Sequence, residues 1–570
     1  MKRFFYYFKG YVAETILSPL FKMLEAISEL CVPLVVAKII DVGVANGDRA
    51  YIIKYSLLLV LLGVAGLVVA LFAQYFASKS ATGYASKVRL SLMEKTHKLS
   101  FKQLDEQGAS KLVNVMTEDV MQVQTGVNLT LRLLLRSPFI VFGAVLFSFL
   151  FADAKASLIY TVLIPLLLFI VYFIMTQGIK KFKKARNTAD QMLLATRENL
   201  YGVREVRAFS LEGQEEQKFN AINENLKTDN TKASNFLSFL NPLTYSLVNI
   251  GIIILIYSGA IRVNAGAIST GVVVALYNYM SQILVELIKF VNLTISVSKM
   301  FASLERINKV LDLPEDKQEF KSVENQKVPY IFINGLNFTY TNKGKNVLDN
   351  LSLSLEKGQT LGIIGGTGSG KSTLCSLFYR GYDSYEGDFY INGKSLKDYT
   401  DTEIRQLLAV VPQKAVLFDG TLRENLTWGK KDATDKELLH AVDMSAASEV
   451  LNKCGGLDGV IEESGKNLSG GQRQRLTIAR ALVKDDAEII IFDDSFSALD
   501  FATEAKLLKN LNSYSCTKII VSQRVSSLRC ADKILVLEKG KIDAFGTMEE
   551  VLSSSEIFRE IYNSQVKEEV

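Results

Sequence analysis

Long apolar stretches dominate the first half of the chain. Four of them contain no Asp, Glu, Lys or Arg, and they cover residues 55–78, 156–179, 233–261 and 263–285. Each is long enough for an α-helix that crosses a bilayer, which needs about 20 apolar residues. The pattern therefore predicts four transmembrane helices.

Two further apolar stretches contain charged residues. Residues 17–40 include two glutamates and two lysines, and residues 128–152 include two arginines near their start. We expect both stretches to cross the membrane as well. The expected transmembrane domain therefore has six spans within residues 1–310.

The character of the chain changes after Lys299. Beyond it the sequence is charged, punctuated by glycine and free of further span-length apolar runs, which is typical of a mixed α/β domain that lies in water. We assign residues 329–570 to this domain and the charged segment 311–328 to a linker.

The two long loops between spans predict the orientation of the chain. The loop after the fourth span carries a basic cluster within residues 180–186, and basic loops face the cytoplasm. With six spans, the N-terminus and the C-terminal domain then both lie on the cytoplasmic side, and we expect the protein in the plasma membrane.

The position of the basic cluster beside a span favours the membrane surface over nucleic acid as its partner. We expect both loops to be helical extensions of the spans, either as solvated hairpins or as levers that touch the C-terminal domain.

Composition adds little to this interpretation. The chain of 570 residues is 48% apolar, which is high for a soluble protein. Its five cysteines lack the spacing of a zinc site, so we expect reduced thiols without metal. Glu14 interrupts the first apolar region, and a cleaved signal peptide is therefore not expected.

The segment 365–372 has the sequence GGTGSGKS and matches the P-loop pattern GxxxxGK[ST]. The apolar residues before it favour a strand, and those after it favour a helix. The glycines let backbone amides converge on phosphate groups, Lys371 neutralises the β- and γ-phosphates, and the Ser372 hydroxyl is a ligand for Mg²⁺. The sequence therefore predicts an ATP site in an α/β P-loop domain.

A second apolar run, residues 489–492, ends at Asp493 and Asp494. A carboxylate at the end of a buried strand is costly unless a cation lies beside it. Asp493 is thus the expected second ligand of Mg²⁺. The alternative is a strand-end aspartate that caps a turn.

The segment 467–472, NLSGGQ, resembles the LSGGQ signature of the ABC transporter ATPases. Other residues follow the order and spacing of that family. Tyr340 resembles the aromatic residue that stacks on adenine, Gln413 resembles the glutamine that senses Mg²⁺, and Asp500 resembles the aspartate of a loop that connects two ATP sites. Membrane spans that precede the ATPase domain in one chain resemble the exporter branch.

The resemblance implies a fold, two cofactors and a partner. The fold is an α-helical domain with six spans, followed by an α/β P-loop ATPase domain with a helical subdomain. Two such chains pair, and each ATP lies between the P-loop of one chain and the signature of the other. The residues expected to bind ATP are Tyr340, Gly365, Gly366, Thr367, Gly368, Ser369, Gly370, Lys371, Ser372, Thr373 and Gln413. Those expected to hold Mg²⁺ are Ser372, Gln413 and Asp493, and those expected to contact the partner's ATP are Ser469, Gly470, Gly471 and Gln472.

Three positions depart from the family pattern. Asp494 stands where the family has a glutamate that polarises the attacking water, and an error of about 1 Å in such a group can cost about 100-fold in rate. Gln523 stands where the family has a histidine that contacts the γ-phosphate. The only histidines of the chain, His97 and His440, are not placed to replace it and are expected to be surface or packing residues. Ser464 replaces an arginine that contacts the inner loops.

Two catalytic departures beside an intact signature resemble one subunit of a heterodimeric exporter with one degenerate and one competent site. The P-loop of this chain would line the degenerate site, which is expected to hydrolyse ATP weakly or not at all. Its signature would complete the competent site on a second, homologous chain.

The charged residues of the spans bear on the cargo. Glu25 and Glu29 lie one helical turn apart, and Glu286 with Lys289 interrupts the end of the sixth span. Charges within a membrane usually face protein or water. One hypothesis is a cavity that favours cationic amphiphiles. The alternative is that these groups lie in water or pair with Lys22 or with another span.

The leading functional hypothesis is a subunit of an ATP-driven exporter that moves drugs or other amphiphilic small molecules out of the cell. Export of lipid or peptide is the nearest alternative. From another class, the chain could be a regulatory ATP-binding membrane subunit, or a channel, in which ATP gates rather than pumps.

Overall fold

The computed structural model describes residues 2–152, 154–315, 326–340 and 344–566. The chain divides into two compact units: Met1–His97 with Gly108–Leu313, and Lys98–Gln107 with Pro314–Val570. Most of the expected linker, residues 316–325, lies outside the described residues.

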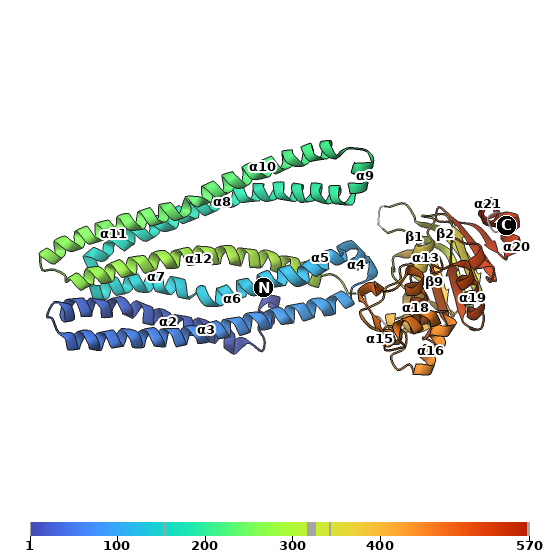
Figure 1. Ribbon diagram of the computed structural model, residues 1–570, viewed down its shortest axis with the longest axis horizontal. Helices are drawn as coiled ribbons and strands as arrows, with labels where there is room; N and C mark the ends of the chain where they lie inside the picture. The colour runs from blue at the N-terminus through green and yellow to red at the C-terminus, as the bar shows by residue number, and fades with distance from the viewer. Residues whose placement is uncertain (1, 153, 316–325, 341–343, 567–570) are drawn as a thin grey trace. The chain divides into compact units, whose positions relative to one another are not determined.

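The first unit is built from long helices (Figure 1). The long helices are α2 (Val12–Lys38), α3 (Arg49–His97), α6 (Val120–Leu133), α7 (Arg136–Phe147), α8 (Ala154–Tyr201), α10 (Glu212–Ser238), α11 (Leu240–Asn264) and α12 (Thr270–Leu311). Short helices are α1 (Lys2–Tyr6), α5 (Ala109–Asn114) and α9 (Val203–Ala208), and π-helical turns occur at Ile39–Val44, Val115–Asp119 and Ser148–Ala152. The long loops after the second and fourth spans are helical, as predicted from the sequence.

Five helical segments of the described residues are long and apolar enough to cross a membrane. They are Arg49–His97, Ala109–Phe151, Ala154–Tyr201, Glu212–Asn264 and Thr270–Leu311. Helix α2 is not among them, because charged residues interrupt it along its length, although it packs along α3 in the same bundle. The sixth span therefore stays a prediction.

The boundary between the last two spans differs from the sequence-based prediction. The charge-free stretches placed it at Arg262, but Arg262 lies in the last turn of α11, and the chain turns at residues 265–269. A basic residue is favourable at the C-terminal end of a helix, so it does not break the helix. The break comes at Gly266, whose φ of +70° is typical of glycine.

Asp41 fixes the start of α12 to the end of α2. One oxygen of its carboxylate accepts a hydrogen bond from the backbone N–H of Gly271 at 2.7 Å, and the other accepts one from the hydroxyl of Ser269 at 2.5 Å. A β-carbon on Gly271 would lie 2.4 Å from the carbonyl oxygen of Ala37. Only glycine lets the two helices come this close, and the carboxylate satisfies one of the free N–H groups at the start of α12.

The second unit is built on a six-stranded sheet of order β12-β11-β3-β10-β9-β6. Its strands are β3 (Thr360–Gly365), β6 (Leu408–Val411), β9 (Ile489–Asp493), β10 (Thr517–Val521), β11 (Lys533–Glu538) and β12 (Lys541–Gly546). All but β12 run parallel. Along β9, Ile490 and Phe492 pack into one core and Ile489 and Ile491 into another. Both faces of the sheet are thus buried, which explains its continuous apolar strands.

An antiparallel sheet and two groups of helices complete this unit (Figure 1). The sheet contains β2 (Leu348–Leu355), β1 (Ile331–Phe338), β4 (Tyr385–Ile391) and β5 (Lys394–Ser395). Between β6 and β9 lie the short strands β7 (Gly420–Thr421) and β8 (Val460–Ile461) and the helices α15 (Leu422–Thr427), α16 (Asp435–Met444), α17 (Ser448–Cys454) and α18 (Gly470–Leu482). The other helices are α13 (Lys371–Phe378), α14 (Asp401–Leu407), α19 (Phe501–Leu511), α20 (Met548–Ser554) and α21 (Glu556–Val566). The prediction of a helical domain followed by a domain with β-sheets is confirmed.

Helix α4 (Phe101–Gln107) belongs to the second unit, although its neighbours in sequence belong to the first. The hydroxyl of Tyr382 donates a hydrogen bond to the carboxylate of Asp105 at 2.5 Å. The ring of Phe101 lies edge-on to that of Tyr379, with centroids 5.8 Å apart. The tip of the first long loop thus touches the α/β domain, as the lever hypothesis requires.

Replacing Asp41 with alanine should destabilise the helical unit. The change removes two hydrogen bonds at the start of α12, and the loss of such a helix cap costs about 0.5–2 kcal/mol. Thermal denaturation of the full chain in detergent should show a lower Tm for D41A and a smaller decrease for D41N, which keeps one oxygen acceptor. D190A removes an exposed carboxylate of α8 and is the matched control. Equal Tm values for D41A and D190A would contradict this role.

Candidate functional site

The predicted P-loop joins β3 to α13 and is shaped by glycine. A β-carbon on Gly365 would lie 2.1 Å from the carbonyl oxygen of Leu537 on the neighbouring strand β11. Gly370, directly before α13, has a φ of +102°, which favours glycine. The loop therefore presents backbone N–H groups at the start of a helix, the arrangement that binds phosphate.

Lys371 is buried against the loop that precedes it. Its ammonium group donates to the carbonyl oxygens of Gly365 and Gly366, both at 2.8 Å. Burial lowers the pKa of Lys371, and the carboxylates of Asp494 and Asp493 oppose this shift. The cation is thus held beside the loop where the phosphate groups are expected.

Asp493 and Ser372 lie together, as the sequence predicted for two Mg²⁺ ligands. The hydroxyl of Ser372 donates a hydrogen bond to Asp493 at 3.1 Å, and burial raises the pKa of Asp493. A hydroxyl and a carboxylate are the oxygen ligands that Mg²⁺ prefers. No three Asp, Glu, His or Cys side chains converge on a metal site among the described residues. A Mg²⁺ ion here would therefore take further ligands from phosphate and water.

Asp494 contacts Gln413 rather than the P-loop serine. The side-chain amide of Gln413 donates to its carboxylate at 3.3 Å, and burial raises the pKa of Asp494, while this hydrogen bond opposes the shift. The backbone of Asp494 has a φ of +48° in the turn after β9. The structure thus brings Asp493, Asp494 and Gln413 to the carboxyl ends of β6 and β9.

Tyr340 lies beside α13 and is partly exposed. Its hydroxyl is 2.9 Å from the hydroxyl of Thr373, its ring lies edge-on to Tyr382 with centroids 5.1 Å apart, and the residue is 42% exposed. An exposed aromatic face near a P-loop can stack on adenine. Tyr382 also binds Asp105 of α4. The ring expected to stack on adenine, that of Tyr340, is therefore linked to α4 through the side chain of Tyr382.

The signature residues form the start of α18. The hydroxyl of Ser469 accepts a hydrogen bond from the backbone N–H of Gln472 at 3.3 Å, and the Gln472 side chain accepts one from the backbone N–H of Ser469 at 3.0 Å. This is a capping box. A serine hydroxyl that accepts one bond can still donate its own hydrogen. Ser469 can therefore contact a phosphate while it caps the helix.

Asp500 caps α19 and lies in a loop held by a residue that the sequence analysis missed. The Asp500 carboxylate accepts a bond from the backbone N–H of Thr503 at 3.0 Å, and bonds from this residue lower the pKa of Asp500. Arg524, next to Gln523, donates to the buried carboxylate of Glu504 at 2.8 Å. Arg524 also donates to a backbone carbonyl beside Asp500. It thus joins the two loops, and nothing in the sequence marks Glu504 as its partner.

The remaining residues singled out from the sequence are two histidines, Ser464 and the cysteines. His97 and His440 are exposed. Ser464 has a φ of +60° within a turn. The five cysteines are free thiols.

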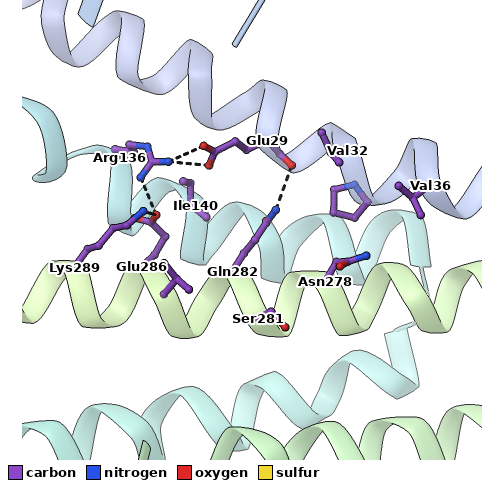
Figure 2. A pocket seen from close by; sticks show the side chains of 12 residues that line it. Glu29, Val32, Val36, Arg136, Ile140, Asn278, Ser281, Gln282, Glu286 and Lys289 are labelled. Atoms are coloured by element: carbon purple, nitrogen blue, oxygen red, sulfur yellow. Dashed lines mark hydrogen bonds and ion pairs between the residues drawn. The ribbon is translucent and has the colours of Figure 1, made fainter. Parts of the chain in front are cut away.

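Two of the three glutamates of the expected cargo region, Glu29 and Glu286, are connected through Arg136 (Figure 2). Glu29 accepts two hydrogen bonds from the guanidinium group of Arg136 at 2.8 Å, and Glu286 accepts one from the same group at 2.7 Å. Glu25 forms an ion pair with Lys22 at 2.5 Å. Every one of these carboxylates is thus matched by a cation, which is the pairing alternative of the sequence analysis. The sequence showed Arg136 but not its partners, which come from two other helices.

Comparison with known proteins identifies the family of both domains. The chain matches the ABC transporter transmembrane region over residues 15–287 and the ABC transporter family over residues 348–497. It is 32% identical over 542 residues to an uncharacterized ABC transporter ATP-binding protein of Bacillus subtilis, covering 95% of this chain and 94% of the relative. It is 28% identical over 498 residues to an ATP-dependent lipid A-core flippase of Hahella chejuensis, covering 87% and 85%. A solved bacterial Atm1-family ABC exporter with ATP bound has a TM-score of 0.78 at 22% identity, over 98% of both chains.

Replacing Lys371 with alanine should weaken ATP binding by about 10- to 100-fold. A hydrogen bond to a charged group contributes about 1.5–3 kcal/mol, and 1.4 kcal/mol is a factor of ten. Equilibrium titration of the full chain with a fluorescent ATP analogue measures the affinity. K506A removes an exposed lysine of α19 and should bind as the unmodified chain does. Equal affinities of K371A and K506A would contradict the assigned site.

Proposed function

Because the chain belongs to the ABC transporter family and joins a transmembrane and an ATPase domain as exporters do, we propose that it is one half of a heterodimeric exporter. In this proposal two homologous chains form the transporter, and the ATP site at the P-loop of this chain binds ATP with Mg²⁺ but hydrolyses it slowly. The cargo is an amphiphilic compound that the pair moves out of the cell.

The observation that carries the proposal is the pair Asp494 and Gln523. A general base must come within about 2.6–3.2 Å of the proton that it removes. The carboxylate of Asp494 is one methylene shorter than that of a glutamate, and it is bonded to Gln413. Glutamine at position 523 cannot become a cation beside the γ-phosphate. Both changes favour retention of ATP over its cleavage.

The capping box at Ser469 supports the second half of the proposal. The hydroxyl and the first backbone N–H groups of α18 form a site for a phosphate group, and the signature sequence departs at none of its residues. It would contact the γ-phosphate bound to the partner chain. The competent site of the exporter would then contain the partner's P-loop and the signature of this chain.

The ion pairs of α2 support a sixth membrane span. Charges within a membrane are tolerated where they pair with one another or face protein. Glu25 pairs with Lys22 on the same helix, and Glu29 pairs with Arg136 on α7. With α2 as the first span, the N-terminus and the ATPase domain lie on the cytoplasmic side of the plasma membrane.

A lipid-like cargo is favoured over other amphiphiles. One relative that covers most of the chain is a lipid A-core flippase, and the charges of the bundle are paired rather than uniformly acidic. A purely cationic drug therefore has no excess of negative charge to bind. The alternative, a subunit in which ATP gates a passive pathway, predicts a different dependence on hydrolysis.

The chain purified alone should hydrolyse ATP slowly, and the double variant D494E/Q523H should be at least about 10-fold faster. A general base contributes about 10²- to 10⁴-fold to such a reaction. Phosphate release at saturating ATP measures turnover. D494N is the matched control, because it removes the carboxylate and should leave the slow rate nearly unchanged. A large decrease in D494N would mean that Asp494 already acts as the base, and the degenerate-site proposal would be wrong.

Vesicles that contain both chains should accumulate a fluorescent lipid-like probe against its gradient with ATP, and not with a non-hydrolysable analogue. S469A in this chain should reduce both transport and ATP hydrolysis by the pair, since it removes a donor from the partner's site. S553A, which removes an exposed hydroxyl near the end of α20, is the control. Equilibration of the probe with the non-hydrolysable analogue would favour gating over pumping.

A further inference from the structure

We infer that a cavity between α2, α7 and α12 binds a zwitterionic head group, with its ammonium at Glu29 and its phosphate or carboxylate at Lys289. This inference names the class of cargo and rests on the proposed export function. The cavity has a volume of about 450 Å³ and is shown in Figure 2. It lies within the helical unit.

A chain of ion pairs crosses one side of this cavity. The ammonium of Lys289 lies 2.8 Å from Glu286, Glu286 lies 2.7 Å from Arg136, and Arg136 lies 2.8 Å from Glu29. The hydroxyl of Ser137 donates a further bond to Glu286 at 2.8 Å. Two acids and two bases thus alternate, and the lining carries no net charge.

The inner and outer members of this chain differ in exposure. The side chains of Arg136 and Glu286 are only 7% and 4% exposed, whereas those of Glu29 and Lys289 are 42% and 41% exposed. The inner pair therefore holds the helices together. The outer pair presents one negative and one positive group to a ligand.

The outer groups have hydrogen-bonding capacity to spare. An ammonium group carries three donors, and among the described residues Lys289 uses one of them, in its bond to Glu286. A carboxylate has about four acceptor positions, of which Arg136 takes two on Glu29. Gln282 donates to the backbone carbonyl of Glu29, and its own side-chain oxygen is buried without a hydrogen-bond partner among the described residues. Glu29 can therefore accept further hydrogen bonds from a ligand, and Lys289 can donate further ones.

Charge balance selects a zwitterion over a simple ion. Because the lining is neutral, a cation at Glu29 adds an uncompensated positive charge and is repelled by Lys289. An anion at Lys289 adds an uncompensated negative charge and is repelled by Glu29. A head group with both charges satisfies both ends of the chain. The third glutamate, Glu25, is already balanced by Lys22 and does not change this result.

A second cavity supplies room for an apolar tail. It has a volume of about 440 Å³ and shares Glu29 and Val32 with the first. Glu25 and Ser28 of α2 line one side of it, and apolar residues of α3 line the other. Gly63 and Gly66 in its wall have open space where a β-carbon would lie. The ligand is thus an amphiphile rather than a soluble zwitterion.

Equilibrium binding of three probes with one chain length tests the inference. The full chain in a neutral maltoside detergent is titrated with dodecylphosphoethanolamine, dodecylammonium and dodecyl phosphate, without ATP or partner. The zwitterion should bind at least about 10-fold more tightly than either ion. E29Q should lose about 10-fold for the zwitterion and weaken the cation but not the anion. K289Q should weaken the zwitterion and the anion but not the cation.

Matched controls separate this result from instability. E224Q and K227Q change an exposed Glu–Lys pair of α10 with the same spacing as Glu286 and Lys289, and they should bind all probes as the unmodified chain does. Equal Tm values for K289Q and K227Q show that the folded state is intact. Because Lys289 is half exposed, K289Q keeps the test valid even if E29Q unfolds.

Three outcomes would overturn the inference. They are tightest binding of dodecylammonium, equal binding of all three probes, and binding of free phosphoethanolamine as tightly as of its dodecyl form. None of these bears on ATP-driven transport. Conversely, failure of transport by the paired chains would leave the binding preference measurable, so the two proposals fail separately.

Discussion

Burying an ionised side chain costs several kcal/mol unless an opposite charge or polar groups replace the water around it. This constraint governs both units. Each buried charged side chain among the described residues is matched by an ion pair or by carbonyl oxygens: Lys22 with Glu25, Asp119 with Arg306, Arg136 with Glu286, Glu504 with Arg524, and Lys371 and Lys518 with backbone carbonyls. In the helical unit, the matching joins helices. Arg136 contacts glutamates of α2 and α12, so the charges that interrupt the apolar pattern also hold the bundle together.

In the ATPase domain the same constraint is met less completely. Lys371 is bonded to carbonyl oxygens, and Asp493 is bonded to a hydroxyl. The pKa of the lysine is lowered and that of the aspartate is raised, both toward the neutral form. The triphosphate of ATP, with the divalent cation proposed beside it, would supply the charges that these two groups lack. The site therefore gains more from its ligands than a site with internal ion pairs would.

The sequence could predict the features that depend on neighbouring residues. The P-loop, the strand that ends at Asp493 and the signature at residues 467–472 are each contiguous, and local geometry follows from the residues themselves. Features that depend on distant partners could not be predicted. Arg136 was visible as a charge in a span, but its contact with Glu286 joins positions 150 residues apart. The boundary between the last two spans was placed at Arg262, a few residues too early. A charged residue in the last turn of a helix cannot be told from one in a loop by sequence alone. The pairing of Glu504 with Arg524 has no pattern along the chain.

Helix α4 shows that the two units are not consecutive in the chain. Lys98–Gln107 folds with residues that follow position 313, and Asp105 and Phe101 cover Tyr382 and Tyr379. A fragment that begins at Pro314 would lose this cover and expose two tyrosines. Exchange of ATPase domains between related transporters would therefore have to preserve the match between these tyrosines and a helix encoded more than two hundred residues upstream. An exchanged ATPase domain keeps this contact only if Lys98–Gln107 is exchanged together with the residues from Pro314 onward.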